Sequence, residues 1–112
     1  MKFTEETSRK YLGGIRSAYL AYAADDEVRS DAASGGAVTA LLGYLLDREE
    51  ITGAIVTKAV CSGGRIDCAV VLAKTRDEIL SARTSKYIDA SVVSGTLRLL
   101  KEHDGPAAVV GL

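Results

Sequence analysis

Apolar residues recur along this chain with two different periods, and each period predicts a kind of element. From Val38 onward, apolar side chains follow at Leu41, Leu42 and Leu45, which is the spacing of a helix with one apolar face. We expect these four side chains to face a sheet, with Leu42 fully buried. Over residues 66–73, larger apolar side chains stand at every second position, which is typical of a strand.

Glycines, prolines and capping residues divide the rest of the chain. Thr75 and Glu78 have the spacing of a capping box and predict the start of a short helix. A later helix is expected to begin at Asp89 or Ser91 and to end before Gly105. The other expected elements are an arm or weak helix over 1–14, a first strand over 17–23, a short helix over 25–33, a strand over 51–60, a turn over 62–65 and a last strand over 107–111.

The order of these elements predicts an α/β fold in a single domain over 1–112. Two strand–helix–strand crossover units joined by a hairpin would form a mixed β-sheet with helices packed on it, and a ferredoxin-like βαββαβ arrangement fits this order. Because the sequence stops directly after the apolar strand expected over 107–111, we expect the chain to be an N-terminal fragment of a longer protein.

Composition and charge narrow the function classes. Of the 112 residues, 47% are hydrophobic and 26% are charged, as in a globular protein with a core, and the net charge of −1 gives no field that would attract nucleic acid. The apolar run after Gly36 is too short to span a membrane, and no signal peptide precedes it, so we expect a cytoplasmic protein. The spacing of Cys61 and Cys68 matches neither a disulfide framework nor a metal site, and we interpret both as buried thiols.

The first candidate site is the sequence Ser34-Gly35-Gly36 directly before the most apolar helix. Ser34 is a candidate N-cap, and the two glycines would leave backbone amides of the first helical turn uncovered. An anion would then be favoured by the amides and the helix dipole. The alternative is that these residues only cap the helix and allow close packing.

The second candidate site is the loop 83–87, which carries two cations, two hydroxyls and one aromatic side chain. Loops of this composition bind ligands, but a solvated connector between two helices has the same composition. His103, the single histidine, lies where a helix ends and is interpreted as compensating the helix dipole rather than as a catalyst.

Several stretches together resemble a known family. They are Asp25 to Arg29, Ala32 to Leu42, Ile51 to Val56, Thr75 to Leu80, Ser85-Lys86-Tyr87 and Ala108 to Gly111. In this order and spacing, they resemble the N-terminal region of the coenzyme F420 hydrogenase/dehydrogenase beta-subunit family, from about Ile15 to Leu112.

The resemblance implies part of an oxidoreductase subunit that holds FAD and iron–sulfur clusters and passes electrons or hydride to or from coenzyme F420 or a similar acceptor. Family members continue with cysteine groups that bind the clusters, and this chain lacks them, so no cluster is assigned to Cys61 or Cys68. The implied partners are the remainder of the polypeptide and other hydrogenase or dehydrogenase subunits. The fragment alone is expected to be inactive.

The resemblance and the residue chemistry indicate the same two places for a flavin nucleotide. The predicted cofactor-binding residues are Ser34, Gly35, Gly36, Thr39, Ser85, Lys86 and Tyr87. We expect the two stretches to lie close together in space. No catalytic residue and no metal ligand is predicted, because hydride chemistry belongs to the cofactor. Two alternatives stay open: a non-catalytic module that docks through the outer face of the last strand, and a phosphate-ligand binding domain without redox function.

Overall fold

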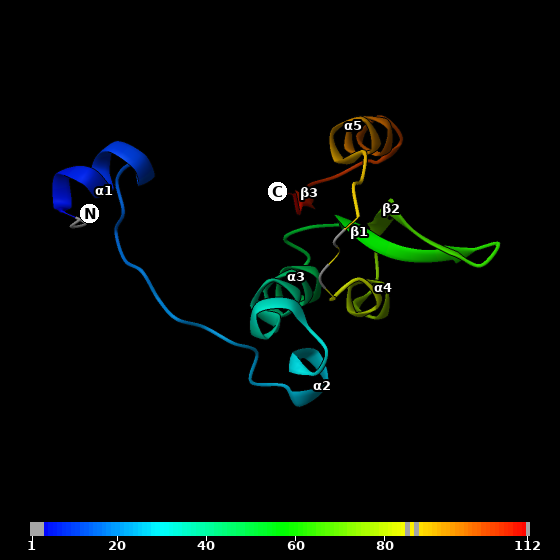
Figure 1. The fold of residues 1–112 in the computed structure, drawn as a ribbon, viewed down its shortest axis with the longest axis horizontal. Coiled ribbons are helices and arrows are strands. Elements are labelled where there is room, and N and C mark those ends of the chain that lie inside the picture. The colour runs from blue at the N-terminus through cyan, green and yellow to red at the C-terminus, as the bar shows by residue number, and fades with distance from the viewer. Residues whose placement is uncertain (1–3, 85, 87, 112) are drawn as a thin grey trace.

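A computed structural model describes residues 4–84, 86 and 88–111, and shows a small sheet with helices on both faces (Figure 1). The elements are α1 (Glu5–Leu12), α2 (Asp26–Arg29), the 3-10 helix η1 (Ala33–Gly36), α3 (Ala37–Asp47), β1 (Gly53–Ser62), β2 (Arg65–Ala73), α4 (Arg76–Ser81), α5 (Val92–Glu102) and β3 (Ala107–Val109).

The sheet has the strand order β2-β1-β3 and is mixed. β1 pairs antiparallel with β2 across a turn at Gly63 and Gly64, and pairs parallel with β3, with Ala54 opposite Ala108. The predicted hairpin, the last strand and the α/β class with a mixed sheet are therefore confirmed. The ferredoxin-like arrangement is not confirmed, because it needs a fourth strand.

The sheet separates two helical layers. Leu42 of α3 and Ile79 of α4 pack with Ala54, Val56 and Ala73 in a buried cluster on one face. On the other face, α5 approaches β2 closely, since a Cβ built at Gly95 would lie 2.8 Å from Cβ of Val70. The predicted capping box begins α4: the amide of Glu78 donates to the Thr75 hydroxyl, and the Glu78 carboxylate accepts from the Thr75 amide.

The predicted first strand over 17–23 is wrong. This segment is irregular and runs away from the sheet toward α1 (Figure 1), and Tyr19, Leu20 and Tyr22 are exposed. A strand needs a neighbour for its backbone groups, and apolar composition alone does not supply one. Its last residue, Ala23, is buried and donates its amide to the carbonyl of Gly35 at 2.8 Å, which ties the segment to η1.

The predicted helix after Gly36 is confirmed, but its buried face is turned from the expected one. Leu42 is 5% exposed, as predicted, whereas Val38 is 53% and Leu41 57% exposed. Leu46 packs against the core cluster, and Gly43, expected on the outer face, is buried. The reason is that α4 packs beside Gly43, whose missing side chain leaves room for Arg76 at 3.8 Å from a built Cβ.

Over 1–14, where an arm or a weak helix was expected, the structure has the helix α1. Two smaller expectations change. The helix α2 ends at Arg29 rather than near residue 33, because Asp31 takes the left-handed conformation with φ of 58°. Cys61 is exposed and Cys68 half-buried, so neither is the buried thiol expected, because the outer half of the hairpin extends beyond the covering helices (Figure 1). In the described part of the chain, no helix is long and apolar enough to cross a membrane.

Candidate functional site

The turn before α3 is made by three consecutive residues with positive φ. The φ angles are 49° at Ser34, 70° at Gly35 and 76° at Gly36. The N-cap of α3 is Gly36, so the prediction that Ser34 caps this helix is wrong. Ser34 lies two residues before this N-cap, and its left-handed backbone is part of the turn that sets the direction of α3.

The two glycines are required by packing as well as by φ. A Cβ built at Gly35 would lie 2.9 Å from Cβ of Tyr22, and one at Gly36 would lie 2.8 Å from the carbonyl oxygen of Val28. We expected the two glycines to leave open space beside the backbone amides. This is wrong, because Tyr22 and Val28 fill the space next to the two Cα atoms. Close packing, the alternative named for this motif, accounts for both residues.

The first turn of α3 nevertheless has the chemistry of an anion site. No side chain caps the helix, so amides of its first turn lack a side-chain acceptor, and the positive end of the helix dipole adds to their attraction for negative charge. Thr39, a predicted site residue, lies half-buried in this turn. A phosphate group approaching here would meet backbone donors.

Lys86, in the second predicted stretch, turns back onto its own loop. Its Nζ donates to the carbonyl of Ala82 at 2.5 Å and to the carbonyl of Thr84. Partial burial lowers the pKa of Lys86, because the charged form loses water contact. Through these hydrogen bonds, the charged amine of Lys86 stabilises the loop after α4. Ser85 and Tyr87, the other predicted residues of this stretch, lie outside the described residues.

Both the backbone and the side chain of Arg83 form hydrogen bonds that join the two predicted stretches. The Ala33 amide donates to the Arg83 carbonyl at 2.9 Å, and Arg83 Nε donates to the carbonyl of Ser30 at 3.0 Å. Arg83 Nη1 also donates to the carbonyl of Leu80 at 2.9 Å. The turn before α3 and the start of the loop after α4 are thus neighbours, with Arg83 as the link. That Ser34, Gly35 and Gly36 lie beside Ser85, Lys86 and Tyr87 stays a prediction, because Ser85 and Tyr87 lie outside the described residues.

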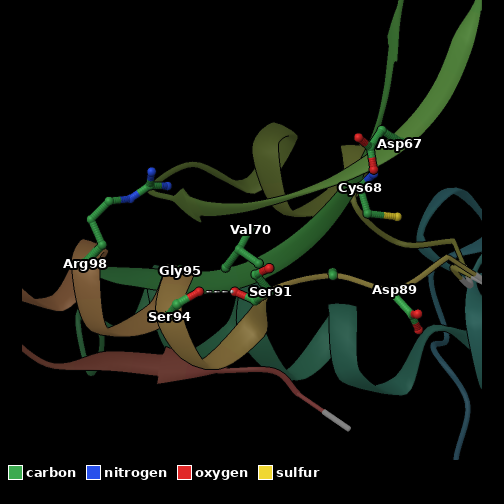
Figure 2. A pocket seen from close by; sticks show the side chains of 9 residues that line it. Asp67, Cys68, Val70, Asp89, Ser91, Ser94, Gly95 and Arg98 are labelled. Carbon is green, nitrogen blue, oxygen red and sulfur yellow. Dashed lines mark hydrogen bonds between the residues drawn. The ribbon is translucent and has the colours of Figure 1, made fainter.

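A cavity of about 470 Å³ lies elsewhere, between β2 and the first half of α5 (Figure 2). Asp67 and Cys68 line it from β2, and Asp89, Ser94 and Arg98 line it from the side of α5. Among the predicted cofactor residues that the structure describes, none lines this cavity, and sequence reasoning missed it. The available signal was the polar side of an amphipathic helix, on which Ser94 and Arg98 stand.

The charges along this cavity are mixed. In Figure 2, Arg98 lies at one end, and Asp67 and Asp89 lie toward the other, while Ser94 Oγ donates to the Ser91 carbonyl at 3.4 Å. Ser91 is the N-cap of α5, but its side chain makes no capping bond. Within the ranges that the structure describes, no group of three or more His, Cys, Asp or Glu side chains is placed to hold a metal ion.

Comparison with known proteins defines the class to which this fold belongs. Residues 18–98, more than half of the chain, match the family model of the coenzyme F420 hydrogenase/dehydrogenase beta subunit, N-terminal region. The chain therefore belongs to this family, as the sequence motifs indicated. A comparison with curated protein sequences gave no match.

A solved structure supports the same assignment. The chain is similar to one in the F420-reducing [NiFe] hydrogenase complex from Methanosarcina barkeri, with 33% identity and a TM-score of 0.56. The match covers 65% of this chain but 24% of that one, so the chain spans about a quarter of the length of this relative. The similarity thus concerns an oxidoreductase subunit's N-terminal region rather than a whole subunit.

Proposed function

We propose that this domain holds the phosphate end of FAD in a beta subunit that moves electrons or hydride to or from coenzyme F420 or a similar acceptor. The observation that carries the proposal is the uncapped N-terminus of α3, placed beside the loop of Arg83 and Lys86 by the Ala33–Arg83 hydrogen bond. Bound FAD would supply the redox chemistry that links a two-electron carrier to one-electron clusters.

The residues fit one part of the cofactor better than the other. A pyrophosphate suits the first-turn amides of α3 and the Thr39 hydroxyl, and the Arg83 guanidinium lies on the neighbouring loop. The flavin ring needs a larger apolar surface. The cavity between β2 and α5 has a mainly polar lining, which does not suit that ring. We infer that the ring would be held mostly by other parts of the subunit.

Iron–sulfur clusters and partner subunits belong to the same proposal. The chain corresponds to about a quarter of the similar hydrogenase chain, and clusters would be bound by cysteines outside these residues. The similar chain from Methanosarcina barkeri is part of a hydrogenase complex, which supports other subunits as partners. The role of this domain would be to fix one end of FAD, so that residues here bind and orient it without exchanging a proton.

The proposal is tested by titrating the 112-residue chain with ADP, which carries the phosphate end of FAD, and following backbone amides by NMR. We expect the amides from Gly36 to Thr39 to shift, with a dissociation constant on the order of millimolar, because only part of the site is present. Riboflavin, which lacks the phosphates, should cause no such shift. The purified chain is accordingly expected to be colourless after gel filtration.

Two matched variants locate the site. Val38 and Val93 are both exposed and each occupies the second residue of an uncapped helix, α3 or α5. An Asp at either position suits the helix dipole but repels phosphate. Val38→Asp should weaken ADP binding at least tenfold, and Val93→Asp should not. The reverse result would move the site to the cavity at α5, and equal binding of ADP by both variants and the parent would contradict the proposal.

A further inference from the structure

Tyr22 lies directly beside the turn before α3. A Cβ built at Gly35 would lie 2.9 Å from Cβ of Tyr22 and 3.4 Å from its Cα. The following residue, Ala23, donates its amide to the carbonyl of Gly35 at 2.8 Å. Because Gly35 directly precedes Gly36, the N-cap of α3, the base of the Tyr22 side chain is held next to the start of that helix.

The guanidinium of Arg29 lies over the ring of Tyr22. Its central carbon is 5.4 Å from the ring centroid, within the range of a cation–π contact. The same guanidinium forms an ion pair with Asp26, and its Nη1 donates to the carbonyl of Ala23 at 3.5 Å. Because Arg29 is itself held by these two contacts, it fixes the orientation of the Tyr22 ring against α2.

The Tyr22 ring is also open to solvent. Tyr22 is 70% exposed, so a second flat group has room to stack on it. Exposure alone does not single out this residue, since Tyr19 of the same segment is 84% exposed. Among the described residues, however, the contacts with Gly35 and with a cation belong to Tyr22 and not to Tyr19. The structure therefore presents an aromatic ring in a fixed place beside the start of α3.

A flat heteroaromatic ring is the ligand group that this arrangement suits. Nucleic-acid bases stack on aromatic side chains, and each such stack strengthens binding by about 5- to 150-fold. FAD carries two rings of this kind, the adenine and the flavin. The adenine is joined to the pyrophosphate through one ribose, whereas the flavin is joined through the longer ribityl chain. The adenine is therefore the ring that would lie nearer to a pyrophosphate at the first turn of α3.

We propose that the adenine ring of the nucleotide stacks on Tyr22 while its phosphates meet the first-turn amides of α3. This inference rests on the proposed function, from which the place of the phosphates is taken. Tyr22 then determines specificity, because a nucleotide gains the stacking contact and a bare phosphate or pyrophosphate does not. The charge of Arg29 is already paired with Asp26, so the role we assign to Arg29 is to hold the ring.

Comparing ADP with inorganic pyrophosphate tests the stack, because pyrophosphate has the phosphates without the base. Each is titrated into the 112-residue chain and followed by NMR. The parent should bind ADP about tenfold more tightly than pyrophosphate. Nuclear Overhauser contacts should connect the adenine protons of bound ADP with the ring protons of Tyr22.

Three variants separate stacking from folding. Tyr22→Ala removes the ring but keeps the Cβ that contacts Gly35, so the turn should keep its path. It should bind ADP about tenfold more weakly than the parent and pyrophosphate equally well. Tyr22→Phe keeps an aromatic face and should bind ADP within about twofold of the parent. Tyr19→Ala is the matched control, because it removes an exposed tyrosine of the same segment, and it should bind both compounds like the parent.

The outcomes separate this inference from the proposed function. Equal affinity of the parent for ADP and pyrophosphate, with no effect of Tyr22→Ala on either, would overturn the stack and leave the phosphate site standing. Contacts of the Tyr22 ring with riboflavin instead of ADP would also overturn it, since the flavin would then occupy the ring. Adenine contacts with Tyr22 that leave the amides from Gly36 to Thr39 unshifted would support the stack and contradict the phosphate site. A parent that binds neither ADP nor pyrophosphate would contradict both.

Discussion

The backbone amide of Ala33 donates to the carbonyl of Arg83 at 2.9 Å, and this bond joins the turn before α3 to the loop after α4. The Arg83 side chain strengthens the same junction through Ser30 and Leu80. Arg83 therefore sets the position of one candidate stretch relative to the other without itself belonging to the predicted site.

Replacing Arg83 with Gln should loosen this junction. Each lost hydrogen bond is worth about 0.5–1.5 kcal/mol, so backbone amides over 30–36 should exchange with deuterium several-fold faster. Hydrogen exchange read by mass spectrometry measures this, with Arg98→Gln on α5 as the control. Equal protection of residues 30–36 in Arg83→Gln and the parent would show that backbone contacts suffice.

Leu42→Ala should destabilise the domain by about 2–5 kcal/mol, because Leu42 is 5% exposed and packs in the core between α3, α4 and the sheet. For a domain of this size that is a large part of the total stability. Urea unfolding measures the change. Tyr44→Ala, on the exposed side of the same helix, should cost much less, and similar losses in both variants would contradict the assigned core.

Gly36→Ala tests whether the turn before α3 needs glycine for space as well as for its dihedral angles. Gly64 has nearly the same φ, 75° against 76°, but nothing lies within 4 Å of a Cβ built there. Gly64→Ala should therefore cost only the left-handed strain of about 1–2 kcal/mol. Gly36→Ala should cost more in thermal unfolding, because its methyl group meets the Val28 carbonyl. Equal losses of stability in the two variants would mean that the turn shifts to make room for the methyl group at position 36.

Glu78 should make stability depend on acid pH. Its carboxylate accepts from the amides of Lys74 at 2.6 Å and Thr75 at 3.1 Å, and these bonds lower its pKa. Because the pKa is lower in the folded state, the stabilisation is complete above the unfolded pKa of about 4.3 and is lost as the pH falls below it. The stability difference between the parent and Glu78→Gln should thus shrink between about pH 5 and 3. A difference that stays constant with pH would exclude this role.

The elements that could be predicted are those whose signals are local. The alternation over 66–73 and the capping box at Thr75 depend on near neighbours, and the structure confirms both. The orientation of α3 could not be predicted, because its pattern allows either Leu41 or Leu46 to face inward. The contact between Gly43 and Arg76 decides which side of α3 faces inward, and Arg76 belongs to α4, a helix distant in sequence.

The candidate site shows the same limit. The motif Ser34-Gly35-Gly36 correctly indicated a special turn before a helix, but the capping role of Ser34 depended on where the helix begins. The proximity of Ser34–Gly36 to the Ser85-Lys86-Tyr87 loop stays a prediction. The composition of the loop marks Arg83 only as one of two cations and does not indicate its bonds to Ala33 and Ser30, which depend on a segment distant in sequence. The cavity at Arg98 is formed by β2 and α5 and had no contiguous motif.

The packing of Gly35 and Gly36 has a consequence for how this motif should be read across related genomes. Any side chain at either position would collide with Tyr22 or Val28, whatever the domain binds. Purifying selection on the backbone path alone would therefore preserve both glycines, even in a relative that bound no cofactor. Position 34 also has a left-handed backbone, with φ of 49°, and we expect it to vary among Ser, Asn, Asp and Gly, which tolerate that conformation. The glycine pair thus marks descent of the fold, and evidence of a retained cofactor has to come from the amides that follow it.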